Sequence, residues 1–316
     1  MKMKKYKKII IAAVSVFLCI CITVSAVIVI KRNKKASPVK GENSSASTGE
    51  ISQTAAPTAS AAVTESQTES VTSAPTTAKP KPTEQYKPST DFTYYSFYKI
   101  DGALPQKDAV SGSWFDDAVF VGDSVSVKLT MYEASVDRLG KAQFLTAGSL
   151  SATNALWDVS DNSVHPSYNG KKQKVEDSIS QMSDIKKVYI MLGMNDITSV
   201  GVNNGIKNFE EFCNRILTKN PNVQIYVQSV TPLINGSKSS VPEEGKLNNK
   251  TIYEYNCKLS ALAQKRGWYF VNVAEAMLDK DGCLNNDYCG DPEFMGLHFT
   301  NSGCKVWIDY LLTHTP

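Results

Sequence analysis

The sequence predicts an α/β domain with a five-stranded parallel sheet, held behind a membrane-spanning segment and a flexible linker. Three observations lead to this prediction: a long apolar run near the start of the 316-residue chain, a stretch of linker-like composition after it, and alternating strand-like and helix-like segments beyond. We therefore expect a cytoplasmic tail at residues 1–8, an anchor at 9–30, a disordered linker at 31–91 and one folded domain at 92–316.

The predicted anchor is an uncharged apolar run. Residues 9–30 read IIIAAVSVFLCICITVSAVIVI, and a helix of that length crosses a hydrocarbon core of about 30 Å. Basic residues flank the run on both sides, so charge only weakly favours a cytoplasmic N-terminus. We expect a single-pass membrane protein whose folded domain is extracellular. The alternative is a secreted protein, cleaved by signal peptidase near Ala26.

The predicted linker has too few apolar residues to fold. In residues 36–90, 35 of 55 are Ser, Thr, Ala or Pro, and the only aromatic residue is Tyr86. Such a segment stays disordered because it cannot bury enough apolar surface to offset its conformational entropy. Residues 1–90 carry 13 Lys and Arg against 5 Asp and Glu, which leaves 21 against 26 for the rest. This mildly acidic remainder excludes a nucleic-acid-binding domain, which needs a clustered basic face.

The rest of the chain alternates strand-like runs with helical periodicity. Predicted strands lie at 118–123, 143–148, 187–193, 224–230 and 268–273. Most of these runs are nearly continuous in apolar residues, as in strands covered on both faces. Helical periods follow at 206–217 and 252–262, and a last helix begins near Asn301 or Ser302. Alternation of this kind predicts a parallel sheet between two helical layers.

Residues suited to acyl transfer lie where three of these strands end. The first run ends in VGDS, with Ser124 at the strand-to-helix turn, the second reaches Gly148, and the third ends in GMND, which includes Asn195. His298 comes just before the last helix. In parallel α/β sheets, ligands bind at the carboxyl ends of the strands. A hydroxyl nucleophile, an imidazole base and donors for an oxyanion are the groups that acyl transfer needs.

These four blocks, in this order, resemble the SGNH or GDSL-type hydrolase family over most of residues 115–314. The resemblance implies a three-layer α/β/α sandwich. It implies Ser124 as nucleophile and His298 as general base, and an oxyanion hole formed by the Ser124 amide with Gly148 and Asn195. Members of the family are esterases, lipases, carbohydrate deacetylases and some O-acyltransferases.

One position departs from the family pattern. Its last block is DxxH, and the residue three before His298 is Met295. Three interpretations follow: a dyad of Ser124 and His298 with a backbone carbonyl orienting the ring, an acid supplied by Asp291 or Glu293 looping back, or a site that binds without catalysis. An acid matters because it holds the imidazole in the required tautomer. The candidate catalytic residues are Ser124, His298 and Asp291.

The cysteines give no sign of a metal site. Those after the linker are Cys213, Cys257, Cys283, Cys289 and Cys304, without CxxC spacing. Spacing allows a disulfide between Cys283 and Cys289 or between Cys289 and Cys304, and at least one thiol stays unpaired. No metal or other cofactor is expected.

The remaining residues of interest have structural interpretations. We expect His165 to lie in a solvated loop and His314 to be exposed near the C-terminus. Asp196 is expected only to cap the helix after the third strand. The aromatic residues between positions 92 and 98 are expected to pack the end of the linker onto the domain: Phe92, Tyr94, Tyr95, Phe97 and Tyr98.

The function predicted from these residues is that of an anchored extracellular serine esterase. We expect it to remove small acyl groups, in particular acetyl, from a carbohydrate or cell-wall glycan. The alternatives are a glycan-binding surface protein with little catalysis, and an O-acyltransferase that would need a partner protein to deliver the acyl donor across the membrane. The sequence leaves the oligomeric state open.

Overall fold

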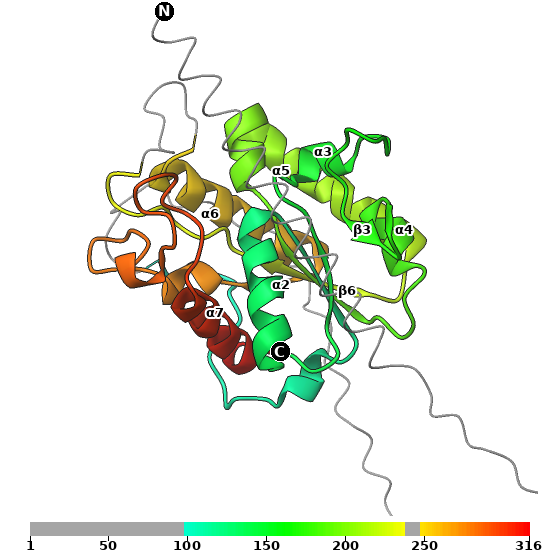
Figure 1. The fold of residues 1–316 in the computed structure, drawn as a ribbon, viewed down its shortest axis with the longest axis horizontal. Helices are drawn as coiled ribbons and strands as arrows, with labels where there is room; N and C mark the ends of the chain where they lie inside the picture. Colours follow the sequence, from blue (N-terminus) through cyan, green and yellow to red (C-terminus); the bar gives the residue numbers. More distant parts are fainter. Residues whose placement is uncertain (1–97, 238–246) are drawn as a thin grey trace, which may run out of the picture. The chain divides into compact units, whose positions relative to one another are not determined.

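A five-stranded parallel sheet forms the centre of the computed structural model, which describes residues 98–237 and 247–316 (Figure 1). Its strands are β1 (Ala118–Gly122), β2 (Gln143–Thr146), β5 (Lys187–Met191), β6 (Gln224–Gln228) and β7 (Tyr269–Val271). They are ordered β2-β1-β5-β6-β7, and each neighbouring pair is parallel. All five predicted strands are confirmed, and each ends one or two residues earlier than predicted.

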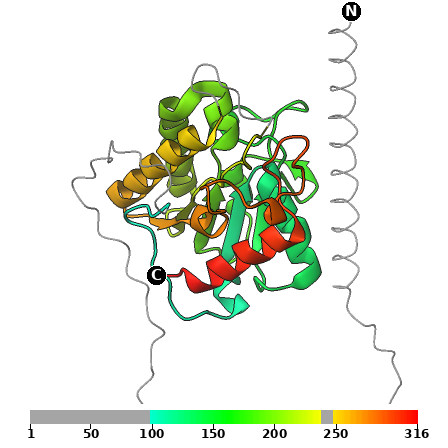
Figure 2. The same ribbon diagram turned by 90° about the vertical axis from the view of Figure 1, so that its left-hand side faces the viewer.

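Helices cover both faces of the sheet. On one face lie α2 (Ser124–Val136) and α7 (Asn301–Thr313), which contact each other and are seen side by side in Figure 1. On the other lie α3 (Ala152–Ala155), α4 (Val175–Ile179), α5 (Met194–Lys219) and α6 (Asn249–Arg266). Figure 2 shows α6 and α7 on opposite sides of the sheet. The predicted three-layer α/β/α sandwich is therefore confirmed.

Short elements connect these layers. Single 3₁₀ turns occur at η1 (Gly112–Phe115), η2 (Val273–Ala276) and η3 (Asn286–Tyr288). A small antiparallel hairpin is formed by β3 (Ser167–Tyr168) and β4 (Lys171–Lys172). The last predicted helix is α7, and its cap is Thr300, whose hydroxyl accepts the Gly303 N–H at 3.2 Å.

A row of neighbouring aromatic rings crosses the sheet, with one ring from each strand. Neighbouring ring centroids lie 4.3 to 5.3 Å apart in the order Phe144, Phe120, Tyr189, Tyr226, Tyr269. The row faces α7, because Gln228, two residues after Tyr226, accepts a hydrogen bond from Trp307 Nε1 at 2.8 Å. Aromatic pairs of this kind each add about 0.5–1.5 kcal/mol beyond the burial of their area. The row thus fixes the register of the strands whose ends form the site.

The predicted anchor at 9–30 and the predicted linker at 31–91 lie outside the described residues. Of the predicted aromatic cluster, Tyr98 is described. It is buried, and its ring meets the edge of Tyr253 with centroids 5.1 Å apart. Within the described residues, no helix is both long enough and apolar enough to cross a membrane.

Candidate active site

Ser124 lies at the tight turn between β1 and α2. The strand ends at Gly122, where a Cβ would lie 2.0 Å from Ser126 Oγ, so only glycine allows α2 to approach this closely. Asp123 then caps the helix, because its Oδ1 accepts the Val125 N–H at 3.0 Å. Ser124 is therefore the first residue of α2, at the carboxyl edge of the sheet, and its own N–H has no acceptor within the helix.

Ser124, His298 and Asp291 form one chain of hydrogen bonds. His298 Nε2 lies 2.9 Å from Ser124 Oγ, and His298 Nδ1 lies 2.7 Å from Asp291 Oδ2. A carboxylate accepts but does not donate, so the proton of a neutral imidazole is held on Nδ1. Nε2 is then free to accept the proton of the Ser124 hydroxyl.

Asp291, the first residue of the loop that leads to His298, accepts hydrogen bonds from four backbone N–H groups of the same loop. Oδ1 of Asp291 accepts the backbone N–H groups of Leu297 and His298, each at 3.0 Å. The main-chain oxygen of Asp291 accepts the N–H groups of Phe294 at 2.9 Å and Gly296 at 3.0 Å. These bonds fold the residues between the acid and the histidine outward. An acid seven residues before the histidine thereby reaches the imidazole.

This geometry distinguishes between the arrangements that the sequence left open. Nδ1 of His298 faces the Asp291 carboxylate, so no backbone carbonyl orients the ring. Glu293 is exposed, and Met295 is half-buried, with its main-chain oxygen accepting a hydrogen bond from Ser237 Oγ. The structure thus contains the arrangement in which Asp291 loops back.

The two other expected oxyanion donors come from the strands beside β1. Gly148 lies in a tight turn after β2, in which Leu150 N donates to Ala147 O at 3.2 Å. Asn195 is the second residue of α5, directly after β5, and its Nδ2 lies 3.1 Å from Leu150 O and 3.3 Å from Asp123 Oδ2. Since β2, β1 and β5 are neighbours in the sheet, their carboxyl ends bring these groups to one place.

Asp196 contacts the start of another helix, which corrects the prediction that it only caps its own. Its buried carboxylate accepts the N–H groups of Ala152 at 3.0 Å and Thr153 at 2.9 Å, and the Thr153 hydroxyl at 2.6 Å. Asp196 therefore fixes the start of α3, and with it the turn that carries Gly148. Close packing also sets the start of α5, because a Cβ on Gly193 would lie 2.5 Å from the Tyr255 ring.

Two carboxylates beside the Ser–His pair have opposite pKa shifts. Burial raises the pKa of Asp123 to about 6, although the hydrogen bond from Val125 and the nearby His298 lower it in part. Burial acts in the same direction on Asp291. There, hydrogen bonds from His298 and from the Leu297 N–H outweigh it and hold the pKa below its ordinary value. Asp291 is thus an ionised partner for the imidazole at neutral pH.

Comparison with known proteins identifies the family of this chain. The GDSL-like lipase/acylhydrolase family model matches residues 120–306, which is more than half of the chain. The chain belongs to this family. No curated protein sequence matches the chain.

Several solved structures are similar to this GDSL-like domain. A GDSL-like lipase from Bacteroides thetaiotaomicron is 16% identical, with a TM-score of 0.45, and the match covers 62% of this chain and 86% of that one. The periplasmic domain of a lipopolysaccharide acetyltransferase from Salmonella Paratyphi A is 16% identical, with a TM-score of 0.42, over 62% and 82%. A carbohydrate acetylesterase from Sinorhizobium meliloti is 14% identical, with a TM-score of 0.41, over 62% and 96%.

The other two histidines of this GDSL-like domain are buried, contrary to prediction. His165 is 3% exposed, its Nδ1 lies 2.9 Å from Ser163 Oγ, and burial lowers its pKa. His314 is 6% exposed because it stacks on Tyr310 with ring centroids 3.5 Å apart. Its Nδ1 also lies 2.9 Å from the Tyr310 carbonyl oxygen. Neither histidine is hydrogen bonded to the Ser124–His298 pair.

The disulfides that spacing allowed are not formed. No disulfide joins Cys213, Cys257, Cys283, Cys289 and Cys304 to one another. Cys289 Sγ lies 3.5 Å from Asp291 Oδ1 and donates to that carboxylate, while Cys304 is fully buried on α7. Burial raises the pKa of Cys289 to about 11, so this thiol stays protonated.

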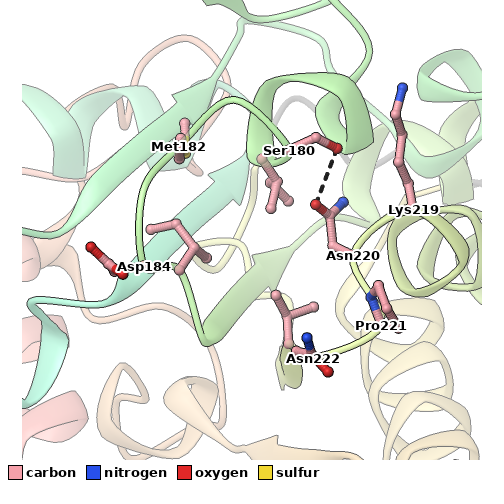
Figure 3. Close-up of a pocket in the computed structure, with 10 residues that line it drawn as sticks. Ser180, Met182, Asp184, Lys219, Asn220, Pro221 and Asn222 are labelled. Carbon is pink, nitrogen blue, oxygen red and sulfur yellow. Dashed lines mark hydrogen bonds between the residues drawn. The ribbon is translucent and has the colours of Figure 1, made fainter.

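A separate surface hollow of about 270 Å³ lies between the loops at 179–185 and 219–223 (Figure 3). These loops precede β5 and β6, so the hollow is at the amino edge of the sheet, opposite to Ser124. Its serine, Ser180, is hydrogen bonded to Asn220 Oδ1 at 3.1 Å, as the dashed line shows, and no histidine lines it. The hollow therefore offers no nucleophile–base pair.

The sequence reasoning missed Asp123. This residue was noted only as part of the VGDS block, yet its two oxygens contact both the start of α2 and the Asn195 side chain. The sequence did indicate that Asp123 is buried, because its carboxylate lies between an apolar strand and the nucleophile. A buried carboxylate needs hydrogen-bond donors, and the donors here belong to the site.

Proposed function

We propose that this domain is a serine esterase that hydrolyses small acyl esters in two steps, through an acyl-enzyme on Ser124. The observation that carries the proposal is the chain of hydrogen bonds from Ser124 through His298 to Asp291, with distances of 2.9 and 2.7 Å. Nucleophile, base and orienting acid within hydrogen-bond reach of one another are the arrangement that activates a serine hydroxyl.

In the first step, Ser124 Oγ forms a bond to the carbonyl carbon of the ester while its proton passes to His298 Nε2. The carbonyl π electrons move onto the substrate oxygen. The backbone N–H groups of Ser124 and Gly148 and the amide of Asn195 stabilise the resulting oxyanion. When this intermediate collapses, the bond to the alcohol oxygen breaks, and the alcohol leaves with the proton from His298.

In the second step, water repeats the sequence on the acyl-enzyme. His298 takes a proton from the water, the hydroxyl adds to the acyl carbon, and the bond to Ser124 Oγ breaks as that oxygen regains a proton from His298. Asp291 stays ionised throughout and stabilises the imidazolium that forms in both steps. Its lowered pKa suits that role.

For the substrate and the location we propose an acetylated carbohydrate outside the cell. The apolar run at 9–30 and the Ser-, Thr-, Ala- and Pro-rich linker at 31–91 support a domain tethered to the outer face of a membrane, within reach of a cell wall. Partial digestion of intact cells with an external protease tests the location. Release of the folded domain into the medium is expected, and protection from the protease until lysis would contradict it.

Hydrolysis of p-nitrophenyl acetate by the full chain tests the activity. Ser124→Ala is expected to lower kcat/KM by at least about 10⁴-fold with an unchanged melting temperature. Ser180→Ala is the matched control, because it removes a serine hydroxyl at the other edge of the sheet, and it should hydrolyse the ester like wild type. Equal activity in Ser124→Ala and wild type would contradict an acyl-enzyme on Ser124.

An acetylated oligosaccharide tests the substrate class. Acetate release that depends on Ser124 is the expected result. If the acetyl group instead appears on an added glycan acceptor in place of water, the domain is a transferase with the same acyl-enzyme.

A further inference from the structure

The carboxamide of Asn195 needs an orienting partner. Its nitrogen and oxygen occupy nearly the same space, yet only the nitrogen donates a hydrogen bond. An oxyanion hole that uses this side chain therefore works in one of its two flipped orientations. Packing alone cannot distinguish them, because the two ends of the amide have the same size.

Two acceptors hold the nitrogen in place. Asn195 Nδ2 lies 3.1 Å from Leu150 O and 3.3 Å from Asp123 Oδ2. In the flipped orientation, the Asn195 oxygen would face a carbonyl oxygen and a carboxylate oxygen and would bond to neither. Buried acceptors left without donors each cost about 1–3 kcal/mol, so the flip is strongly disfavoured.

Asp123 joins this amide to the nucleophile. Its side chain is buried, its Oδ1 accepts the Val125 N–H at 3.0 Å at the start of α2, and its Oδ2 faces Asn195. The titratable groups that face it are His298 from the loop before α7 and Asp196 from α5. One carboxylate thus connects the helix that begins with Ser124 to the side chain expected to stabilise the oxyanion.

We propose that Asp123 is a positioning residue, which locks the Asn195 carboxamide with its nitrogen facing the nucleophile before substrate binds. The bond from Nδ2 to Asp123 is the longer of the two, and its proton can be shared with the developing oxyanion as a three-centre hydrogen bond. This inference rests on the proposed esterase function and adds a residue that does not itself contact the substrate.

A double-mutant cycle on kcat for p-nitrophenyl acetate tests the proposal. Asp123→Asn keeps the shape and the helix cap, since Asn caps helices as well as Asp does. Its amide nitrogen would face the Asn195 nitrogen, so Asn195 is expected to flip and kcat to fall about 10- to 100-fold, with little change in KM. Asn195→Ala should lower kcat at least as much. The double variant should equal Asn195→Ala alone.

Additive losses in this cycle would overturn the proposal, because they would mean that Asp123 supports the fold by a route that does not pass through Asn195. Glu133→Gln is the matched control. Glu133 is likewise a buried acid, but it lies near the C-terminal end of α2, where its carboxylate accepts the Leu139 N–H. Its kcat should match that of wild type.

A second readout does not depend on turnover. The side-chain amide protons of Asn195, assigned by their loss in Asn195→Ala, should exchange slowly with solvent in wild type and lose that protection in Asp123→Asn. Unchanged exchange in Asp123→Asn would overturn the positioning role, even if the chain does not hydrolyse esters. Absence of hydrolysis that depends on Ser124 would refute the proposed function, and the exchange experiment would still decide the inference.

Discussion

The two halves of the candidate active site are built in different ways. Ser124, Gly148 and Asn195 follow directly from the ends of three neighbouring strands, so the sheet itself sets their separation. Asp291 and His298 lie between η3 and α7, in a loop without helix or strand. The loop is held by hydrogen bonds to Asp291, by the Gly290 N–H to the His298 carbonyl oxygen at 2.7 Å, and by bonds from residues 234 and 237 to residues 295 and 296. The strand half is fixed by many packed residues. The loop half depends on a few bonds, so single substitutions should disrupt it most.

The largest effect is expected at the acid of the loop half. Asp291→Asn would keep the shape of the carboxylate but favour the wrong tautomer of His298, so kcat should fall about 10³- to 10⁴-fold. Hydrolysis of p-nitrophenyl acetate, with circular dichroism to show an intact fold, measures it. Glu293→Gln is the control and should have wild-type activity. Wild-type kcat in Asp291→Asn would contradict the role of Asp291 as the acid.

The carboxylates of the two halves should change the stability of the fold in opposite directions as the pH rises. The pKa of Asp123 is raised in the folded chain from 3.8 to about 6, so its stabilising contribution is present below pH 4 and lost as the pH rises through about 6. Wild type should therefore lose up to about 3 kcal/mol of unfolding free energy relative to Asp123→Asn between pH 4 and 7. Urea unfolding at several pH values measures this difference.

Asp291 should show the opposite sign. Its pKa is lowered in the folded chain, so its stabilising contribution is present above the ordinary pKa of an aspartate and is lost as the pH falls through the folded value. Wild type should lose stability relative to Asp291→Asn only below about pH 4. If both variants change with pH in the same direction, the contrast between the two halves is wrong.

A smaller loss of kcat is expected from a substitution that shifts the loop between Asp291 and His298. Gly296 has a φ of +71°, and a Cβ there would lie 2.6 Å from Ile234 Cγ1. Gly296→Ala should lower kcat about tenfold by shifting Asp291, and destabilise the fold by about 1–3 kcal/mol. Gly170→Ala is a matched control, because Gly170 has a φ of +78° but open space around it. It should share the backbone strain and keep full activity. Equal losses of activity in both would contradict the role of the loop.

The smallest effect is expected at the thiol beside the acid. Cys289 Sγ donates a weak hydrogen bond to Asp291 Oδ1 over 3.5 Å. Such a bond is worth about 0.5 kcal/mol, so Cys289→Ala should lower kcat only about two- to threefold. Cys304→Ala, which removes a buried thiol that has no hydrogen bond to the acid, should leave kcat unchanged. A loss above tenfold in Cys289→Ala would mean that the thiol, and not the backbone, holds Asp291.

The same contrast explains what the sequence could predict. Apolar runs and helical periods reflect which residues are buried, so they predicted all five strands and the turn that carries Ser124. The position of Asp291 depended on two N–H groups, of Leu297 and His298, that meet its carboxylate after the loop has folded. No local pattern encodes such bonds, and the sequence left three arrangements open.

The burial of some polar residues also could not be predicted from the sequence. His314 was expected in solvent because it is two residues from the C-terminus, yet stacking on Tyr310 buries it. Asp196 was expected to cap one helix, and it orders the start of another. In each case the partner comes from the packing of whole elements, which a window of neighbouring residues does not contain. The predicted anchor and linker stay predictions.

The hydrogen bond between Ser124 and His298 joins residues that are 174 positions apart in the chain. The nucleophile is synthesised well before its base and acid, which come after all five strands of the sheet. A nascent or truncated chain can therefore build most of the sheet and still have an unactivated serine. Ester hydrolysis would therefore require a chain that extends at least through His298, and a product cut between Ser124 and Asp291 would be inert.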